Sequence, residues 1–235
     1  MAFAAISKDI VQKILTDVSD FRAGLLNADS PHYDDKALTL FLLLRFRAGI
    51  DFQIHTCEAA LCDMLRLSNR TENKQSIMLN LQRFEEDGLI TMRRSDNGKF
   101  FWISLNPDAF VAKSDYALID ADEFNAVMNM YSRDKLLLLL YCIKKYQHKK
   151  TNISFVSIET IAQETQMSKS TITQGIQSLR SVLDIYQAII VFENGKTKEV
   201  NYYAPAGSNV DLEEEVESLV RQHYKNVQYI TKKEI

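Results

Sequence analysis

The pattern of apolar positions in this chain occurs twice, and the second copy follows the first after 95 residues. In each copy three apolar residues recur at intervals of four and three, namely Ile77, Leu81 and Phe84, and later Ile172, Ile176 and Leu179. This spacing places the three side chains on one face of a helix. Each copy continues into apolar runs around a turn, at Asn97-Gly98 or Asn194-Gly195, which is a strong signal for a β-hairpin. The sequence therefore predicts two units in which a helix precedes a hairpin.

The residues before each of these helices extend the repeat. Strongly apolar helices are predicted at 35–48 and 133–146, and short strands follow at 51–55 and 153–156. A shorter helix comes next in each unit, at 57–66 and from Ser157 onward. The third helices are predicted at 73–87 and 168–180, and the hairpin strands at 89–94, 99–105, 188–193 and 198–204. The predicted fold class is mainly α with small β-hairpins, an α+β arrangement in which each unit runs helix, strand, helix, turn, helix, hairpin.

The two units divide the chain into five segments. These are an N-terminal helical extension at 1–35, a first domain at 36–106, an acidic linker at 107–131, a second domain at 132–207 and a C-terminal helix at 208–235. Apolar residues at helical spacing predict the two outer helices, at 6–26 and 211–230. Their apolar stripes have two interpretations, because each stripe either packs on its own domain or pairs two chains into a homodimer.

Basic residues gather in the repeated units, although the whole chain has a net charge of −3. Residues 36–106 contain 10 basic and 8 acidic residues, and residues 132–207 contain 10 basic and 6 acidic ones. The segments outside these units are acidic. Because a nucleic-acid footprint depends on where the positive charge lies, this distribution is compatible with two DNA-binding units. So small a surplus predicts weak affinity for DNA of random sequence.

Each predicted third helix has a polar face opposite its apolar one, and polar side chains of this kind can read base edges. In the second unit the face carries Lys169, Ser170, Thr171, Thr173, Gln174 and Gln177, and no carboxylate follows until Asp184. In the first unit the face carries Asn73, Lys74, Gln75, Asn80 and Arg83. A polar face is also typical of any surface helix, so the DNA-binding interpretation depends on two copies with matching hairpins.

Further basic residues are predicted to lie where they would meet DNA phosphates. Arg93, Arg94 and Lys99 bracket the first hairpin turn, and Lys196 and Lys198 follow the second. The densest basic run, at the end of the second unit's first helix, contains Lys144, Lys145, Lys149 and Lys150. Phosphate contacts position a protein on DNA without specifying sequence. Alternatively, the residues at these positions are basic only because hairpin tips and helix ends are exposed to solvent.

No catalytic constellation occurs in the sequence. The phosphate-binding loop, the nucleophile elbow and the zincin motif are all missing, so we expect a non-enzymatic protein without a cofactor. His55, Cys57 and Cys62 lack a fourth ligand at suitable spacing, and no metal site is expected. The start of the chain does not resemble a signal peptide, and the five-leucine run Leu136–Leu140 is too short to span a membrane. Three cysteines without a CxxC pair fit the reducing cytoplasm, which is the expected localisation.

Both units resemble the winged-helix superfamily. The resemblance rests on Ile77-x3-Leu81-x2-Phe84-x4-Leu89-Ile90 with the Asn97-Gly98 turn, and on the corresponding set centred on Ile172. It covers about residues 36–105 and 132–204, and departs from the family at the long turn 69–73 and at 183–187, where the approach to the hairpin is longer. The resemblance implies that the third helices enter successive major grooves of double-stranded DNA while the hairpins, or wings, contact its backbone.

Two tandem winged helices in a chain of this size are similar to bacterial and plasmid replication initiator proteins. That resemblance implies sequence-specific binding of double-stranded DNA in replication initiation or transcription control of a bacterial, plasmid or phage genome. A second resemblance is to the acidic accessory subunits of chromosome-condensation complexes, whose tandem winged helices form a protein-binding scaffold. The overall acidity of the chain and the acidic segment 107–131 favour the second resemblance, and the basic faces of the two third helices oppose it.

Overall fold

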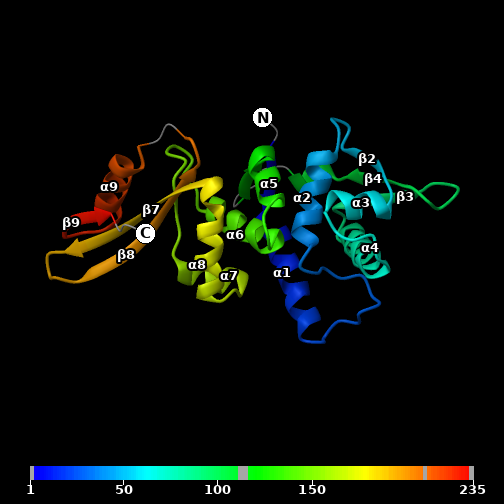
Figure 1. Cartoon of the computed structure of the whole chain (residues 1–235), viewed down its shortest axis with the longest axis horizontal. Coiled ribbons are helices and arrows are strands. Elements are labelled where there is room, and N and C mark those ends of the chain that lie inside the picture. The colour runs from blue at the N-terminus through cyan, green and yellow to red at the C-terminus, as the bar shows by residue number, and fades with distance from the viewer. Residues whose placement is uncertain (1–2, 111–115, 209–210, 233–235) are drawn as a thin grey trace. The chain divides into compact units, whose positions relative to one another are not determined.

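The computed structural model describes residues 3–110, 116–208 and 211–232, which form two compact units (Figure 1). Unit 1 comprises Met1–Leu137, and unit 2 comprises Leu138–Ile235. Both are mixtures of helices and small antiparallel sheets, as the predicted α+β class requires. The division between the units falls inside helix α6 (Arg133–Lys145).

Unit 1 contains the first copy of the repeated pattern. The copy consists of α2 (Ala37–Arg47), β2 (Gln53–Thr56), α3 (Glu58–Met64), α4 (Thr71–Glu86), β3 (Ile90–Arg94) and β4 (Phe101–Leu105). This is the order expected from the sequence, with bounds that differ by a few residues. The strands form an antiparallel sheet in the order β2-β4-β3. Gly98 lies in the predicted turn between β3 and β4 at a φ of 67°, a left-handed conformation that favours glycine.

Helix α2 is buried on all sides at the centre of this copy. Every residue from Ala37 to Leu44 is buried, which explains why the sequence shows a continuous apolar run here and not a stripe. The ring centroid of Phe41 lies 5.5 Å from that of Phe84 in α4, and the Phe84 centroid lies 5.1 Å from that of Tyr33. The predicted apolar face of α4 is thus confirmed as part of the core.

The segments around this copy contain more structure than the sequence predicted. A strand, β1 (Phe3–Ser7), precedes α1 (Lys8–Arg22), so the outer helix is shorter than the predicted 6–26. The segment 107–131, predicted as an acidic linker, contains η1 (Pro107–Phe110), β5 (Tyr116–Asp120) and α5 (Ala121–Met128) around residues that lie outside the described ranges. Strand β5 pairs antiparallel with β1, so this segment belongs to the fold of unit 1.

The second copy begins with α6 and continues through unit 2. It consists of α6, β6 (Ser154–Phe155), α7 (Ile158–Thr165), α8 (Lys169–Ser178), η2 (Leu179–Ser181), β7 (Leu183–Phe192) and β8 (Thr197–Pro205). Its order also agrees with the sequence. The longer approach at 183–187 is the first half of strand β7, which is 10 residues long, whereas the sequence predicted a strand from 188 onward.

The chain after the second hairpin forms a helix and a further strand, whereas the sequence predicted one helix over 211–230. Helix α9 (Leu212–His223) ends at Tyr224, and β9 (Val227–Lys232) pairs antiparallel with β7. The helix prediction was wrong after His223. Asn226 takes a left-handed φ of 58° between the two elements, and the β-branched and aromatic residues that follow favour a strand. The resulting sheet has the strand order β6-β8-β7-β9.

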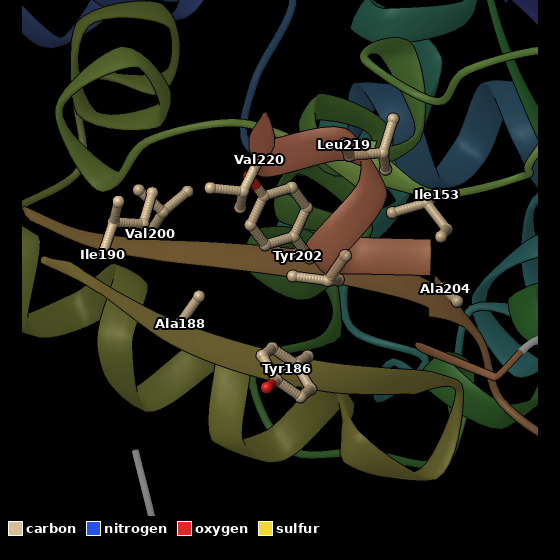
Figure 2. Close-up of a cluster of buried hydrophobic side chains, with 10 residues drawn as sticks. Ile153, Tyr186, Ala188, Ile190, Val200, Tyr202, Ala204, Leu219 and Val220 are labelled. Carbon is tan, nitrogen blue, oxygen red and sulfur yellow. The ribbon is translucent and has the colours of Figure 1, made fainter. Parts of the chain in front are cut away.

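Helix α9 covers one face of this sheet (Figure 2). Its Val216, Leu219 and Val220 join a buried cluster with alternate residues of β7 and β8, among them Ile190 and Tyr202. The apolar residues of α1 are likewise buried within the chain: Ile10, Val11, Ile14 and Val18. These residues of α1 and α9 therefore pack within the chain, as the first interpretation of the outer helices predicted, while Leu25, beyond the end of α1, is 73% exposed.

Candidate nucleic-acid interface

Two serine caps fix the helix pair α7 and α8 in unit 2. Ser157 begins α7, and its Oγ accepts a hydrogen bond from the backbone N–H of Thr160 at 3.0 Å. Ser168, at the predicted start of the third helix, accepts in the same way from the N–H of Thr171 at 3.2 Å. Between the helices Gln166 ends α7 in a left-handed conformation with a φ of 58°. The caps satisfy backbone donors that each helix start leaves open, so the orientation of α8 is defined locally.

Helix α8 presents a polar face without a carboxylate. Its buried residues are Ile172, Gly175 and Ile176, as the apolar spacing predicted. Five residues of the predicted polar face are exposed, namely Lys169, Ser170, Thr173, Gln174 and Gln177, and so is Ser178, while Thr171 is half-buried. Since the helix contains no acidic residue, this face can approach phosphates and base edges without charge repulsion.

The side chains on this face differ in how far they are engaged within the protein. The Thr173 hydroxyl donates to the carbonyl oxygen of Lys169 at 2.9 Å. The ammonium of Lys169 pairs with Glu159 of α7 at 2.7 Å and lowers the pKa of that carboxyl, but both groups are exposed, so water screens the pair. Within the described residues, Gln174 and Gln177 have no hydrogen-bond partner for their side-chain amides. These two amides retain their donors and acceptors for a ligand.

The second wing ends in a tight turn with lysines beyond it. Gly195 has a φ of 75°, and the N–H of Phe192 donates to the carbonyl of Lys196 at 2.9 Å. Lys196 and Lys198 are both exposed. The Lys198 ammonium lies 4.9 Å from the ring centroid of Tyr224, which holds this charge near the surface of the sheet. Both lysines remain placed as the sequence predicted, beside a projecting turn.

In unit 1 one residue of the predicted polar face is not on the surface. Asn80 is only 1% exposed. Its Nδ2 donates to Asp34 Oδ1 at 2.9 Å and to the carbonyl of Ser76 at 2.8 Å, and its Oδ1 accepts from the backbone N–H of Asp34 at 3.1 Å. The predicted exposure of Asn80 was wrong because the segment before α2 covers this side of α4.

Arg83 is committed to carboxylates on the same side of α4. Its Nε donates to Asp17 Oδ2 at 2.8 Å and its Nη2 to Asp17 Oδ1 at 3.3 Å, and Asp87 lies 3.9 Å away. The hydrogen bond to Asp17 raises the pKa of Arg83 above its ordinary value. The Tyr33 hydroxyl donates to Asp87 at 2.8 Å. These groups tie α1 to α4, so the structure gives Arg83 a partner that its position in the sequence did not indicate.

The rest of the predicted face of α4 is mixed in exposure and in charge. Gln75 is exposed, and Asn73 and Lys74 are half-buried. The Nδ2 of Asn73 donates to the carbonyl of Ser68 at 2.8 Å. Three glutamates are exposed on the same helix, and these are Glu72, Glu85 and Glu86. The surface of α4 is therefore more acidic than that of α8 and less complementary to phosphate.

The three basic residues of the first wing are exposed but do not share one face. Successive side chains of a strand point to opposite faces. Arg93 is paired across the sheet with the exposed Trp102, whereas Arg94 is paired with the buried Phe101. Lys99 lies in the turn, next to Gly98, and its side chain is exposed. Arg93 thus belongs to the outward face of the sheet, and Arg94 to the side that packs on the helices.

The basic run at the end of α6 is only partly on the surface. Lys144 is buried, and Lys145 pairs with Glu164 of α7 at 2.7 Å, with a side chain that is mostly buried. Lys149 and Lys150 are exposed in the loop that follows. The prediction that this run lies on the surface was wrong for Lys144 and Lys145, because the end of α6 packs into unit 2 before the chain leaves the helix.

The described ranges offer neither a metal-ligand cluster nor a long apolar helix. No cluster of three or more His, Cys, Asp or Glu residues there could hold a metal ion. No helix in those ranges is both long and apolar enough to cross a membrane.

An aromatic group on the sheet of unit 1 was missed by the sequence analysis. Trp102 is 45% exposed and Phe100 is 40% exposed, and His55 stacks on the Trp102 ring at a centroid distance of 4.2 Å. The signal was present in β4, where Trp102 alternates with the buried Phe101 and Ile103. Strand alternation alone therefore predicts that Trp102 points away from the core.

Comparison with known proteins places a helix-turn-helix domain in the second copy. The sequence model of the helix-turn-helix domain family matches residues 133–181, a range that contains α7 and α8. Among solved structures, the crystal structure of RctB domains 2–3 is similar over 82% of this chain and 87% of that chain, with 9% sequence identity and a TM-score of 0.39. A likeness of that degree carries no argument about function. No curated protein matches the chain. The chain thus contains a helix-turn-helix domain, the class of fold that places its second helix against DNA.

Proposed function

We propose that the protein binds double-stranded DNA in a sequence-specific manner, with α8 as its recognition helix. The observation that carries this proposal is the exposed face of α8, which lacks carboxylates and lies in a helix-turn-helix domain. In this fold the second helix of the pair lies in the major groove of DNA. Gln174 and Gln177 are the proposed base readers, because a glutamine amide can pair bidentately with adenine.

The surrounding basic residues of unit 2 are proposed to contact the DNA backbone. Lys169 lies at the N-terminus of α8, where the helix dipole also favours an anion. Lys196 and Lys198 follow the turn of the wing, and Lys149 and Lys150 lie in an exposed loop. Contacts of this kind fix register and orientation and make affinity depend on salt.

Both copies are proposed to be winged-helix units that act on the same duplex. The order of elements in unit 1 supports this proposal, and Lys74, Gln75, Arg94 and Lys99 remain available on α4 and the first wing. The exposed glutamates of α4 make unit 1 the weaker duplex reader. Unit 2 would then supply most of the sequence discrimination, and unit 1 would extend the site.

The proposed process is replication initiation or transcription control on a bacterial, plasmid or phage genome, without a catalytic step and in the cytoplasm. The two roles differ in the symmetry of the DNA site. An initiator whose two units bind successive turns of the duplex would bind direct repeats, whereas a regulator that acts as a homodimer would bind inverted repeats.

A protein-binding scaffold is the second candidate function. The exposed glutamates of α4 favour it for unit 1, because they repel phosphate but can pair with a basic protein surface. This candidate predicts that the whole chain has no salt-dependent affinity for DNA.

The proposed base readers are tested by the double variant Gln174→Ala/Gln177→Ala. Its discrimination between a selected duplex and a random duplex should fall by about 1–3 kcal/mol for each lost bidentate contact, while its affinity for the random duplex stays unchanged. The matched control is Gln222→Ala, which removes an exposed glutamine of α9 outside the helix-turn-helix domain. An equal loss of affinity for both duplexes would show that the two glutamines do not read bases.

A further inference from the structure

The outward face of the unit 1 sheet carries a row of rings beside a cation. His55 of β2, Trp102 of β4 and Arg93 of β3 are direct cross-strand neighbours. The His55 and Trp102 rings stack with a centroid distance of 4.2 Å and an interplanar angle of 21°. The Phe100 ring lies 5.4 Å from that of His55. We call these four residues the aromatic row.

The core does not require these rings on the outside. The opposite face of β4 already fills the core of unit 1, since Phe101, Ile103 and Leu105 are all buried. Trp102 and Phe100 nevertheless remain 45% and 40% exposed. Isolated exposed apolar residues need no explanation, but a group of large rings on one surface marks an interaction site. Two members of the row, Arg93 and Trp102, line a groove of about 510 Å³, whose other lining residues are Gln53, Thr91, Met92 and Ser104.

The charge on this face suits a polyanion. Its six strand residues are Gln53, His55, Thr91, Arg93, Trp102 and Ser104, and none is acidic. Arg94 and Lys99 add positive charge at the end of the hairpin, and Figure 1 shows that the turn between β3 and β4 projects beyond the helices of unit 1. The acidic residues nearest in sequence, Asp51, Glu58 and Asp96, lie outside the paired strands, and the Glu85 carboxylate of α4 accepts a hydrogen bond from the backbone N–H of Met92 in β3 at 2.7 Å.

Flat rings beside a cation select nucleic acid whose bases are unpaired. In a duplex the faces of the bases stack on one another, so only base edges are open to a protein, whereas an unpaired base can stack on an aromatic side chain. We propose that the aromatic row binds single-stranded DNA, with bases stacked on Trp102 and its neighbouring rings and with Arg93 against a phosphate. This activity goes beyond the duplex reading proposed for α8 and uses a different surface.

The test uses the full chain, which has a single tryptophan, Trp102. Tryptophan fluorescence, excited at wavelengths that the ten tyrosines do not absorb, therefore reports on the aromatic row alone. The probe is oligothymidylate of about 12 nucleotides, within the usual site size of single-strand binding folds. We expect it to quench the fluorescence, and we expect an abasic strand with the same number of phosphates to leave it unchanged. Equal quenching by the two strands would overturn the proposal, and tighter binding of oligouridylate RNA would overturn the assignment to DNA.

Variants separate stacking from folding and from general charge. Trp102→Ala should weaken binding of a labelled oligothymidylate about tenfold, the usual effect of losing one stacked base, and Trp102→Phe should weaken it less. The control Tyr131→Ala removes a ring that is 95% exposed in the same unit but outside the row, and it should bind as the native chain does. An unchanged affinity in Trp102→Ala would refute the proposal.

Duplex binding by the same samples keeps this proposal separate from the first. Trp102→Ala should retain the native discrimination between duplexes, and an unchanged circular dichroism spectrum would show that unit 1, which contains the substitution, is still folded. Conversely, Gln174→Ala/Gln177→Ala should retain the native affinity for oligothymidylate. If either variant lost both activities, the claim that duplex and single-stranded DNA bind to two independent surfaces would be contradicted.

Discussion

Replacement of Asn80 by alanine should destabilise unit 1 by about 3 kcal/mol and leave base discrimination unchanged. The sequence placed Asn80 on a DNA-reading face, but the structure buries it between Asp34 and α4. The variant therefore distinguishes a structural residue from a base reader at a position where the two interpretations differ most.

The magnitude follows from three hydrogen bonds of the Asn80 side chain. The bond to the Asp34 carboxylate at 2.9 Å involves a charge and contributes about 1.5 kcal/mol, the lower end of the range for such bonds, because Lys36 and Ser76 also bond that carboxylate. The bonds to the Ser76 carbonyl and from the Asp34 N–H are neutral and worth about 1 kcal/mol each. The higher helix propensity of alanine returns about 0.5 kcal/mol. The net loss of folding free energy is about 3 kcal/mol. In the variant the buried N–H of Asp34 is left without its hydrogen-bond partner.

Urea unfolding followed by Trp102 fluorescence measures this loss. The only tryptophan lies in unit 1, so its signal reports that unit. With an m-value of about 2 kcal/mol/M, the midpoint should fall by about 1.5 M at unchanged slope.

The control for this experiment is Gln82→Ala, which removes an exposed amide from the same helix. Its stability should stay within about 0.5 kcal/mol of the native chain, as is usual for surface substitutions. If Asn80→Ala is no less stable than Gln82→Ala, or if it loses base discrimination at native stability, the reasoning about the buried network is refuted.

Three further predictions concern pH, thiol reactivity and salt. Burial raises the pKa of the Asp34 carboxyl, but Lys36 and the hydrogen bonds from Ser76 and Asn80 outweigh burial and hold that pKa below its ordinary value. The ionised carboxylate therefore stabilises the folded state above the unfolded pKa near 3.9, and this contribution is lost as pH falls through the folded pKa. Acid unfolding of unit 1 should therefore be less steep in Asp34→Asn, and an unchanged acid profile would contradict this role. Burial raises the pKa of the Cys142 thiol to about 12, so iodoacetamide at about pH 8 should alkylate the half-buried Cys57 well before Cys142, as mass spectrometry would show. The double variant Arg94→Ala/Lys99→Ala should flatten the salt dependence of duplex affinity by about one unit per lost phosphate contact, and an unchanged slope would mean that the first wing does not touch DNA.

Local pattern in the sequence predicted the repeated elements well. The spacing of Ile77, Leu81 and Phe84 predicted the buried face of α4, and the Asn-Gly pairs predicted both hairpin turns. The caps of α7 and α8 follow from Ser157 and Ser168. These features depend on residues a few positions apart, which is the range over which helix periodicity and turn chemistry act.

Contacts between distant segments could not be predicted in this way. Helical spacing marks Asn80 and Arg83 as polar, but it does not show that Asp34 and Asp17, 46 and 66 residues earlier, cover them. The pairing of β5 with β1 and that of β9 with β7 likewise join segments far apart in the chain. For the candidate site, periodicity placed the exposed face of α8 correctly because no distant segment among the described residues packs on it, and it misplaced part of α4 because one does.

The central claim is that α8 reads duplex sequence, and selection from a random duplex pool tests it most directly. The native chain and Gln174→Ala/Gln177→Ala would be selected in parallel, and the affinity of each for the enriched and the random pools would be measured over a range of salt. We predict that the native chain enriches a defined motif and that the variant binds random duplex as well as the native chain does but enriches that motif weakly. The claim would be contradicted if the native chain enriched no motif, or if both proteins enriched the same motif equally.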